Sequence, residues 1–567
     1  MDESLELGLQ PDRERYTLPA FLDDVAARHG ERTALRFQSA PEVAWQTLSY
    51  DALRAEARVL ARALMGAGVV KGARVGVLMA NRPEWVVAAF AVSLAGGVLV
   101  PVNTFATPDE RDYILRHSDT SVLLMRRHLR RHDFVAEIFA SHPEIESAEP
   151  GRIRCQALPH LRRVVCLDLA AAHGGIESGA DLLAQGVDIP EALLDAAASE
   201  VRPSDDAILI YTSGTTAHPK GVLHRQRAPV IQSWRFAEAM ALGRDDRVLS
   251  AQPFFWTAGI AMSLGACLGA GATLIVEEVF AAERFLELVE SQRITALHAW
   301  PHQEKAMAEH PDAGLRDLSS LEKIEFSSPL ASLAGIEKDV WGTYGSYGLS
   351  ETFTLASSLA ASAPADLRSG TSGRPLPGMM FRIVDPETGE RLGETGARGE
   401  VAVKGVTFMS GYYKVEPELY LDQEGFFHTQ DGGSFDADGL LHWTGRLSNL
   451  IKTGGANVSP LEIEKALGDC EELSVAQAVG IPHPVLGEVI VLCAVRAAGA
   501  DVDETELRSR LRERLSAYKV PRRVLFFEPD ELSFTSNQKL QVGPLRELAL
   551  ERLQREGAEI EGVRYGR

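Results

Sequence analysis

A polar loop that directly follows a short apolar run constrains the fold of this chain more than any other segment. The apolar run is DAILIY, residues 206–211, and it continues into YTSGTTAHPKG, residues 211–221. The run has the length and composition of a buried strand, so the loop should leave the end of a strand. Its hydroxyls, its glycine and its lysine can together offer many donors and one positive charge to phosphate oxygens. These residues are Thr212, Ser213, Gly214, Thr215, Thr216 and Lys220.

This loop differs from the phosphate loop of P-loop GTPases and ATPases. Its lysine follows a proline, and neither serine nor threonine comes directly after the lysine, so that assignment is unsupported. A cluster of Ser, Thr, Gly and Pro also occurs in ordinary polar surface turns. The segment taken alone therefore leaves two alternatives open, an anion-binding loop and a plain turn.

The rest of the chain predicts a layered α/β body with mostly parallel sheets. Short apolar runs alternate with segments of helical pattern, which is typical of βαβ units. The runs are residues 74–78, 121–124, 164–167 and 272–276. The longest apolar stretch, residues 85–100, is shorter than the about 20 residues of a membrane span, so we expect a buried helix, a glycine break and a strand. At 567 residues, the chain exceeds the roughly 250–300 residues of one core, and at least two domains are expected.

Charge and cysteine content limit the class of protein. A net charge of −21 and a pI near 5.3 argue against nucleic-acid binding. The densest basic patch, residues 126–131, is expected to be a solvated helix face, and a local patch for the phosphates of a ligand stays open as the alternative. Five widely spaced cysteines are expected to be buried thiols in a reducing environment. The acidic N-terminal segment is neither a secretory signal nor an Arg-rich transit peptide. We therefore expect a cytoplasmic protein without transmembrane segments.

Two other kinds of site are disfavoured by the sequence. His298 and His302 are four residues apart, but Pro301 interrupts the helix that would put them on one face, and the sequence offers no zinc-like set of partners around them. We expect structural roles for both. A GxSxG elbow or a paired Cys/His nucleophile does not stand out, so covalent hydrolase chemistry is not expected.

The loop resembles the signature of the adenylate-forming superfamily, which contains acyl-CoA synthetases, luciferases and the adenylation domains of peptide synthetases. Ten of the eleven positions of residues 211–221 agree with that signature, and Ala217 stands where the family has its second loop glycine. Further motifs occur in the order of the family. They are YGLSE at 347–351, GE at 399–400, GYY at 411–413, FHTQD at 427–431, GR at 445–446, the segment 451–464 and TSNQKL at 535–540. Gln430 replaces a glycine of the family pattern.

The resemblance implies a role for each matching residue. The ring of Tyr347 would stack on adenine, Glu351 would hold Mg²⁺, Asp431 would bind the ribose hydroxyls, and Lys539 would bridge the substrate carboxylate and the α-phosphate. The implied catalytic residues are Lys539, Lys220, Glu351 and Ser350. The implied nucleotide-binding residues are Thr212, Ser213, Gly214, Thr215, Thr216, Tyr347, Gly348, Asp431 and Arg446.

The same resemblance implies two domains that move relative to one another. An N-terminal body of layered sheets and helices, residues 1–446, would bind the adenylate and the acyl group. A small, mobile α+β lid, residues 447–567, would rotate about a hinge near Ser448, where the family has Asp or Lys. Rotation would remove Lys539 and bring in the loop of Lys452, Gly454 and Gly455, whose small residues leave a passage for the pantetheine arm of CoA.

The expected acyl pocket is the segment 253–259, PFFWTAG. Amino-acid-activating relatives carry an aspartate here, whereas this chain has Trp256, so an amino acid is not the expected substrate. Phe255, Trp256 and Gly259 are expected to line a pocket for a hydrophobic acid that is fatty, aryl, or bulky and polycyclic or terpenoid. The alternative that the aromatic residues only pack the core stays open.

The function that the resemblance implies is ATP-dependent, Mg²⁺-requiring ligation of a carboxylic acid to CoA through an acyl-adenylate. Three alternatives remain. Ala217 and the turn at Ser327-Ser328 could impair adenylation, so that a partner enzyme supplies the adenylate. The acceptor could be a carrier protein, or the chain could bind adenylate or acyl groups without turnover. The sequence also leaves a homodimer open.

Overall fold

The computed structural model describes residues 16–566, except 40–42, 213–218, 387, 448–450, 469, 533–539 and 541. Several positions that the sequence analysis singles out lie outside the described residues. They are Ser213, Gly214, Thr215, Thr216, Ala217, Ser448 and Lys539. Their expected roles therefore stay predictions from the sequence.

The largest sheet has eight strands in the order β20-β11-β10-β4-β3-β5-β8-β9. The strands from β10 to β9 are parallel, and β11 and β20 add an antiparallel edge. Their bounds are β3 (Arg74–Leu78), β4 (Val98–Pro101), β5 (Val122–Met125), β8 (Arg163–Cys166), β9 (Ile176–Ser178), β10 (Asp206–Thr212), β11 (Lys220–Arg225) and β20 (Gly411–Tyr412). The long apolar stretch forms α3 (Pro83–Leu94), a turn with Gly96 at φ +76°, and β4, as predicted.

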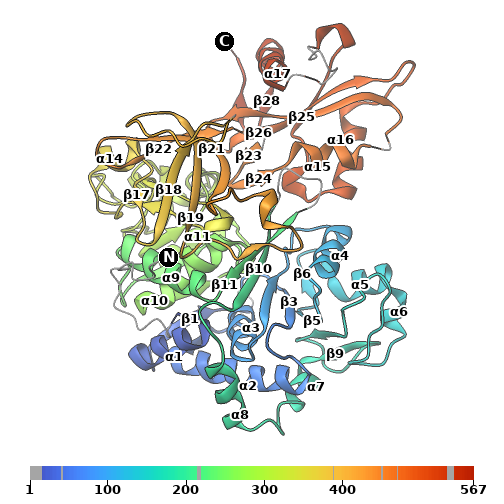
Figure 1. The fold of residues 1–567 in the computed structure, drawn as a ribbon, viewed down its shortest axis with the longest axis vertical. Coiled ribbons are helices and arrows are strands. Elements are labelled where there is room, and N and C mark those ends of the chain that lie inside the picture. Colours follow the sequence, from blue (N-terminus) through green and yellow to red (C-terminus); the bar gives the residue numbers. More distant parts are fainter. Residues whose placement is uncertain are drawn as a thin grey trace.

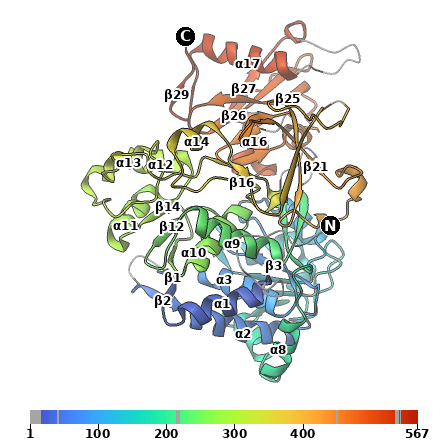
Figure 2. The ribbon, with the colours of Figure 1, turned by 60° about the vertical axis from the view of Figure 1, so that its left-hand side comes forward.

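A second sheet lies beside the first (Figure 2). Its strand order is β14-β12-β13-β1-β2. Its strands are parallel except for β2. They are β1 (Thr33–Phe37), β2 (Gln46–Ser49), β12 (Arg247–Ser250), β13 (Thr273–Val276) and β14 (Ala296–His298). One continuous hydrophobic core joins both sheets to α1 (Leu18–His29), α2 (Tyr50–Gly66), α3, α9 (Arg227–Ala239) and α10 (Ala266–Ala270). The layered body with mostly parallel sheets is therefore confirmed for this half of the chain.

An antiparallel sheet follows these layers and was not predicted from the sequence. It has four strands in chain order, and its core includes Val222 of β11, so it packs on the edge of the largest sheet. The strands are β18 (Met379–Val384), β19 (Gly399–Gly405), β21 (Phe427–Phe435) and β22 (Leu441–Arg446). A small sheet of β15 (Ser346–Tyr347), β16 (Ser357–Ser358) and β17 (Arg374–Pro375) lies beside it.

The last part of the chain forms a small domain of its own, which lies at the top of the molecule in Figure 1. Two hydrophobic cores consist entirely of residues from Ile451 onward. They join β23 (Ile451–Thr453), β24 (Ala456–Val458), β25 (Leu473–His483), β26 (Gly487–Arg496) and β27 (Arg523–Phe526) to α15 (Pro460–Ala466), α16 (Glu504–Arg514) and α17 (Val542–Glu556). The predicted α/β architecture, a large body with a small α+β C-terminal domain, is confirmed. The boundary at residue 446 stays a prediction.

The remaining elements connect these sheets. They are α4 (Pro108–His117), β6 (His128–Leu129), β7 (His132–Asp133), α5 (Phe134–Ser141), α6 (Pro143–Glu146), α7 (Gly179–Ala184), α8 (Glu191–Ser199), α11 (Ala282–Gln292), α12 (Pro301–Ala308), α13 (Pro329–Leu333), α14 (Ala365–Gly370), β28 (Glu559–Ile560) and β29 (Val563–Arg564).

Two sequence predictions are tested by these connecting segments and by burial. The basic segment 126–131 is not a helix face, because it forms the hairpin of β6 and β7, with Arg130 in the turn at φ +53°. All five cysteines are buried free thiols, as predicted. Within the described residues, the chain has no helix that is both long and apolar enough to cross a membrane.

Candidate active site

The described ends of the predicted phosphate loop lie at the open end of a hairpin. Thr212 at the end of β10 is the register partner of Lys220 at the start of β11. The Nζ atom of Lys220 lies 4.7 Å from the ring centroid of Tyr412, and the Tyr412 hydroxyl donates a 2.6 Å hydrogen bond to Oε1 of Glu351. Antiparallel pairing between β11 and β20 holds the tyrosine there. The structure thus brings a predicted lysine and a predicted metal ligand to one place, with an aromatic ring between them.

A second contact joins two residues that the sequence predicts to bind nucleotide. The hydroxyl of Tyr347 donates a 2.8 Å hydrogen bond to Oδ2 of Asp431, whose side chain is buried. Asp431 on β21 is also the register partner of Arg446 on β22. Gly348 permits a close approach of the chain, because a Cβ atom at that position would lie 1.7 Å from the carbonyl oxygen of Thr354. A glycine is therefore required next to the tyrosine.

His224 is a residue of this site that the sequence analysis did not find. It is fully buried on β11, and its Nε2 atom lies 2.7 Å from the carbonyl oxygen of Ser350. Burial lowers the pKa of His224 to about 3, so the ring is neutral and Nε2 is the donor. This bond fixes the short 3₁₀ turn Ser350–Thr352, which carries Glu351. A single histidine on an apolar strand gives no sequence signal for that role.

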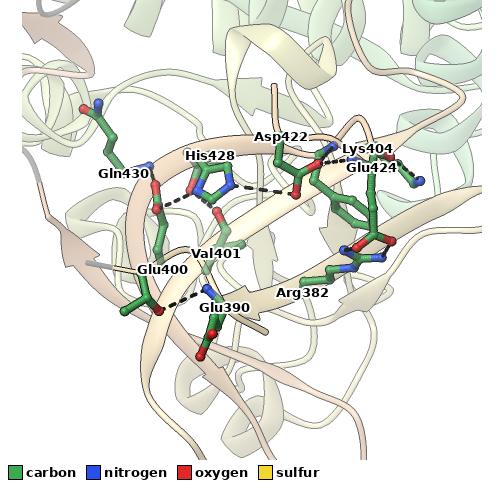
Figure 3. Close-up of polar contacts among 12 residues, drawn as sticks. Arg382, Glu390, Glu400, Val401, Lys404, Asp422, Glu424, His428 and Gln430 are labelled. Carbon is green, nitrogen blue, oxygen red and sulfur yellow. Dashed lines mark hydrogen bonds and ion pairs between the residues drawn. The ribbon is translucent and has the colours of Figure 1, made fainter. Parts of the chain in front are cut away.

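Glu400 holds the segment that carries Asp431 (Figure 3). Its Oε1 atom accepts the backbone N–H of Gln430 at 2.7 Å, and its Oε2 atom lies 3.0 Å from Nδ1 of His428. Gln430 replaces a family glycine, and its φ of +59° lies in the left-handed region that favours glycine. Gln430 therefore has a strained backbone angle, and its backbone N–H donates a charge-assisted hydrogen bond to Glu400.

The predicted acyl segment borders a cavity between the body and the C-terminal domain. The cavity has a volume of about 1340 Å³, and Phe255, Trp256 and Phe105 lie in its wall. The Phe105 and Phe255 rings pack edge to face, with centroids 5.3 Å apart. Gly259 starts a π-helix, Gly259–Gly265, and a Cβ there would lie 2.0 Å from the carbonyl oxygen of Pro253. Such π-helical turns are frequent at functional sites.

The predicted CoA loop packs on the other side of the same cavity. Gly454 and Gly455, in the turn between β23 and β24, have φ values of +55° and +83°. Gly454 lines the cavity together with Trp300. A Cβ on Gly455 would lie 2.8 Å from the ring of Trp300, so only glycine allows this contact. The side chain of Lys452 points elsewhere, with Nζ 4.2 Å from the Trp443 ring centroid.

Basic side chains surround part of this cavity. Arg130 and Arg131 of the β6–β7 hairpin lie in its wall with Arg508, Arg512 and Arg522 of the C-terminal domain. The hairpin is therefore not a remote solvated helix face. It contributes positive charge to the space between the two parts of the chain.

A buried ionic cluster joins the C-terminal domain to α4 of the body. Nζ of Lys519 lies 2.7 Å from Oε1 of Glu110 and 3.3 Å from Oε2 of Glu462. The Ser516 hydroxyl donates to Oε2 of Glu110 at 2.6 Å. Burial raises the pKa of Glu462 to about 7, although Lys519 opposes this rise. The orientation of the two domains in this structure therefore includes ionic contacts between buried groups.

The family model described as AMP-binding enzyme matches residues 22–413, and the model of its C-terminal domain matches residues 462–539. The chain belongs to the family of AMP-binding enzymes. Within it, the chain is an acyl-CoA synthetase of the adenylate-forming superfamily, an enzyme that joins an acid to a thiol.

Three similar proteins illustrate the range of this family. A putative acyl-CoA synthetase, YngI of Bacillus subtilis strain 168, is 30% identical over 94% of this chain and 97% of its own. A CoA ligase of Rhodococcus jostii strain RHA1, named for a methyl-dioxo-octahydro-indenyl propanoyl group, is 31% identical over 94% of this chain and 98% of its own. The amide bond synthetase McbA of Marinactinospora thermotolerans has a similar structure, with a TM-score of 0.73, 27% identity and coverage of 93% and 99%.

In this AMP-binding enzyme, many of the predicted site residues fall into three groups, whereas Gly259 is buried outside the cavity wall and the Lys452 side chain lies at Trp443. The first group consists of two pairs. Tyr412 contacts both Lys220 and Glu351, and Tyr347 contacts Asp431 directly. Phe255, Trp256 and Gly454 line the neighbouring cavity. The third group, which includes Lys539 and most of the phosphate loop, lies outside the described residues. His224 and Trp300 were not predicted, because neither belongs to a local motif.

Proposed function

We propose that this enzyme uses ATP to activate a bulky, ring-bearing hydrophobic carboxylic acid and transfers the acyl group to CoA. The observation that supports this proposal is a single cavity with aromatic acyl-segment residues in one wall and the glycine loop in another. The Rhodococcus jostii relative is named for a bicyclic propanoyl group, which favours a ring-bearing acid over a linear one.

In the first half-reaction, a carboxylate oxygen of the acid attacks the α-phosphorus of ATP and pyrophosphate leaves. Charge develops on phosphoryl oxygens, so preorganised donors and cations lower the barrier. We assign Lys220 and the loop hydroxyls, Thr212, Ser213, Thr215 and Thr216, to these oxygens. Tyr347 would stack on the adenine, and Asp431 would bind the ribose hydroxyls. Lys539 would contact the attacking carboxylate and the α-phosphate.

The residues around Glu351 fit a magnesium ion. A carboxylate offers about four lone-pair directions, and the Tyr412 hydroxyl occupies one of them at Oε1. The remaining directions suit a hard cation, which prefers carboxylate oxygens and phosphates. When bound, Mg²⁺ would neutralise charge on the phosphates. Tyr412 and the His224–Ser350 hydrogen bond would hold the Glu351 side chain and its turn in place.

In the second half-reaction, the thiol of CoA attacks the acyl carbon and AMP leaves. We propose that the pantetheine arm passes the turn of Gly454 and Gly455, where the absence of side chains keeps the passage open. The phosphates of CoA would lie toward the arginines of the cavity wall, among them Arg130 and Arg131.

The three proteins compared above give no support to the alternatives of impaired adenylation, a carrier-protein acceptor or a non-catalytic role. The turn at Ser327-Ser328, which was expected to hinder adenylation, also has a structural role. The hydroxyl of Ser328 accepts the backbone N–H of Leu330 at 3.2 Å and caps α13. The simplest assignment is therefore a ligase that carries out both half-reactions.

A panel of acids tests this function. The purified chain is incubated with ATP, Mg²⁺, CoA and matched linear, aryl and fused-ring acids, and adenylates and thioesters are followed by mass spectrometry. We expect CoA thioesters, formed fastest from ring-bearing acids. A preference for linear acids would contradict the proposed substrate class. Absence of adenylate and thioester with every class of acid would contradict the proposed function.

A matched variant tests the nucleotide site. Tyr347→Phe keeps the aromatic ring and removes only the hydroxyl that contacts Asp431. Loss of a hydrogen bond to a charged group costs about 1.5–3 kcal/mol, so pyrophosphate exchange should fall by roughly 10- to 150-fold. Conversion of a supplied acyl-adenylate would also fall if the same bond positions AMP. Wild-type rates in both assays would contradict the assignment of Tyr347.

A further inference from the structure

A long irregular segment of the body contains a buried cysteine that contacts a histidine and a glutamate. Between α6 and β8, residues 147–162 contain neither helix nor strand. Segments of this length without secondary structure are uncommon inside compact domains. Nevertheless, Ile153, Cys155, Leu158 and Leu161 are buried. These side chains belong to a hydrophobic core that also contains residues of β5 and β8, and the polar contacts of Cys155 lie beside this core.

Cys155, His142 and Glu144 bring three ligand atoms together in this segment. The Sγ atom of Cys155 lies 3.6 Å from Nδ1 of His142 and 3.1 Å from Oε1 of Glu144. Among the residues that the structure describes, this is the one cluster of three or more His, Cys, Asp or Glu with ligand atoms within 4.8 Å of one another. The Cys155 and His142 side chains are buried, whereas Glu144 is exposed.

The spacing of the sulfur and nitrogen atoms matches tetrahedral coordination. Zinc–sulfur and zinc–nitrogen bonds of about 2.3 and 2.1 Å, at a tetrahedral angle, place the two ligand atoms about 3.6 Å apart. The observed distance between Sγ and Nδ1 is 3.6 Å. The exposed Glu144 carboxylate can move the few tenths of an ångström that its own coordination requires. A water molecule can complete the tetrahedron from the exposed side.

Asp112 supplies the outer contact that metal-binding histidines commonly have. Its Oδ2 atom, on α4, lies 2.9 Å from Nε2 of His142, although the angle falls outside hydrogen-bond geometry. A small rotation of the ring would align the pair. A carboxylate behind the distal nitrogen fixes the tautomer in which Nδ1 carries the lone pair. Asp112 thus prepares His142 to bind a cation through Nδ1.

We propose that Cys155, His142 and Glu144 bind one thiophilic divalent cation of the zinc type, with Asp112 as the outer partner. A thiolate with an imidazole and a carboxylate suits such a cation. Cys155 binds as the thiolate, and its proton leaves to solvent. The cation cross-links the irregular segment to the end of α5 and, through Asp112, to α4. That helix also carries Glu110, which holds the C-terminal domain.

The competing explanation is a buried thiol that only donates a hydrogen bond to a carboxylate. The chain contains a matched example of that arrangement, because Cys166 donates to Oδ1 of Asp168 at 3.2 Å. Cys166→Ser is therefore a control for Cys155→Ser. Both variants replace a buried thiol that contacts a carboxylate, and only Cys155 also contacts an imidazole in the described structure.

Cobalt titration distinguishes the two explanations. The full-length protein is stripped of metal with a chelator and titrated with Co²⁺ alone. A thiolate ligand gives a near-ultraviolet charge-transfer band, and four-coordination gives intense visible bands. We expect both bands to saturate at one Co²⁺ per chain and to disappear when Zn²⁺ is added. Cys166→Ser should retain them, and Cys155→Ser should lose them. Asp112→Asn should weaken Co²⁺ binding by about 10- to 100-fold.

The proposal is wrong if the unaltered chain gives no thiolate–cobalt band, or if Cys155→Ser keeps it. Circular dichroism checks that each variant folds. If Cys155→Ser does not fold, Glu144→Gln decides the question, because it alters an exposed side chain. It should weaken Co²⁺ binding by at least about tenfold, and an unchanged affinity would overturn the assignment of that ligand set.

Discussion

Alanine substitutions at Gly454 and Gly455 should separate the two half-reactions. Both glycines have positive φ, so an added Cβ costs about 1 kcal/mol of backbone strain at either position. They differ in what the Cβ would meet. At Gly455 it would lie 2.8 Å from the Trp300 ring, whereas at Gly454 the nearest atom is 3.5 Å away, in His302. Gly454→Ala is therefore a matched control for strain without collision.

The size of the additional effect at Gly455 follows from the collision. Carbon atoms pack at about 3.5–4.0 Å, so Trp300 or the loop would have to move by more than half an ångström. Overpacking of this kind typically costs about 1–3 kcal/mol. If the contact between the loop and Trp300 belongs to the thiol-transfer orientation, Gly455→Ala should slow thioester formation by roughly 5- to 150-fold more than Gly454→Ala.

The assay measures each half-reaction separately. Pyrophosphate exchange reports adenylation, and conversion of a supplied acyl-adenylate with CoA reports thioester formation. Adenylation should change little in either variant. Trp300→Leu should restore part of the lost rate in the Gly455→Ala background, since the smaller side chain leaves room for the Cβ. Equal losses in Gly454→Ala and Gly455→Ala, or a double variant without any recovery, would refute the role of this contact.

Three other predictions concern single residues. Because burial raises the pKa of Glu462 from 4.5 to about 7, the folded chain gains stability from this carboxyl below pH 4.5 and loses it as the pH rises through 7. The free energy of unfolding of Glu462→Gln, measured with denaturant, should therefore rise by up to about 3 kcal/mol relative to that of the unaltered chain as the pH increases from 5 to 8. A difference in unfolding free energy that does not change with pH would contradict this. Gln430→Gly should leave stability unchanged or raise it by about 1 kcal/mol, whereas the β-branched Gln430→Val should lower the denaturation midpoint. Lys539→Ala should reduce pyrophosphate exchange by roughly 100-fold, whereas a supplied acyl-adenylate should still be converted to thioester. Equal losses in the two assays would contradict the proposed role of Lys539.

The parallel part of the fold could be predicted because its strands are short, continuous apolar runs. The run at residues 74–78 is β3 to the residue, and β10 extends the predicted run 206–211 by one. In the antiparallel sheet, not every strand carries such a signal. Its strand β21 has the sequence FHTQDGGSF, in which polar site residues and glycines interrupt any alternation. A strand whose side chains form a binding site does not show the alternation of apolar residues that is typical of a strand packed on a core.

The motifs point to candidate site residues, whereas the contacts between those residues have no signal in the local sequence. Motifs supplied Tyr347, Asp431 and Glu351. The bonds from Tyr347 to Asp431 and from Tyr412 to Glu351 join residues that are 84 and 61 positions apart. Such pairs depend on how β15, β20 and β21 pack together, which local sequence does not encode. The same limit explains why Trp300, which meets the glycine loop of another domain, was missed.

The substitution of a family glycine by Gln430 shows how a departure from a motif has to be judged. A non-glycine residue at a φ of +59° costs about 1–2 kcal/mol. Relaxing that angle would break the hydrogen bond from the Gln430 N–H to Glu400, and bonds to charged groups contribute about 1.5–3 kcal/mol. Because the bond outweighs or matches the strain, the backbone keeps the glycine-like conformation. Asp431, the next residue, therefore remains in contact with Tyr347, and this departure does not argue against ATP binding.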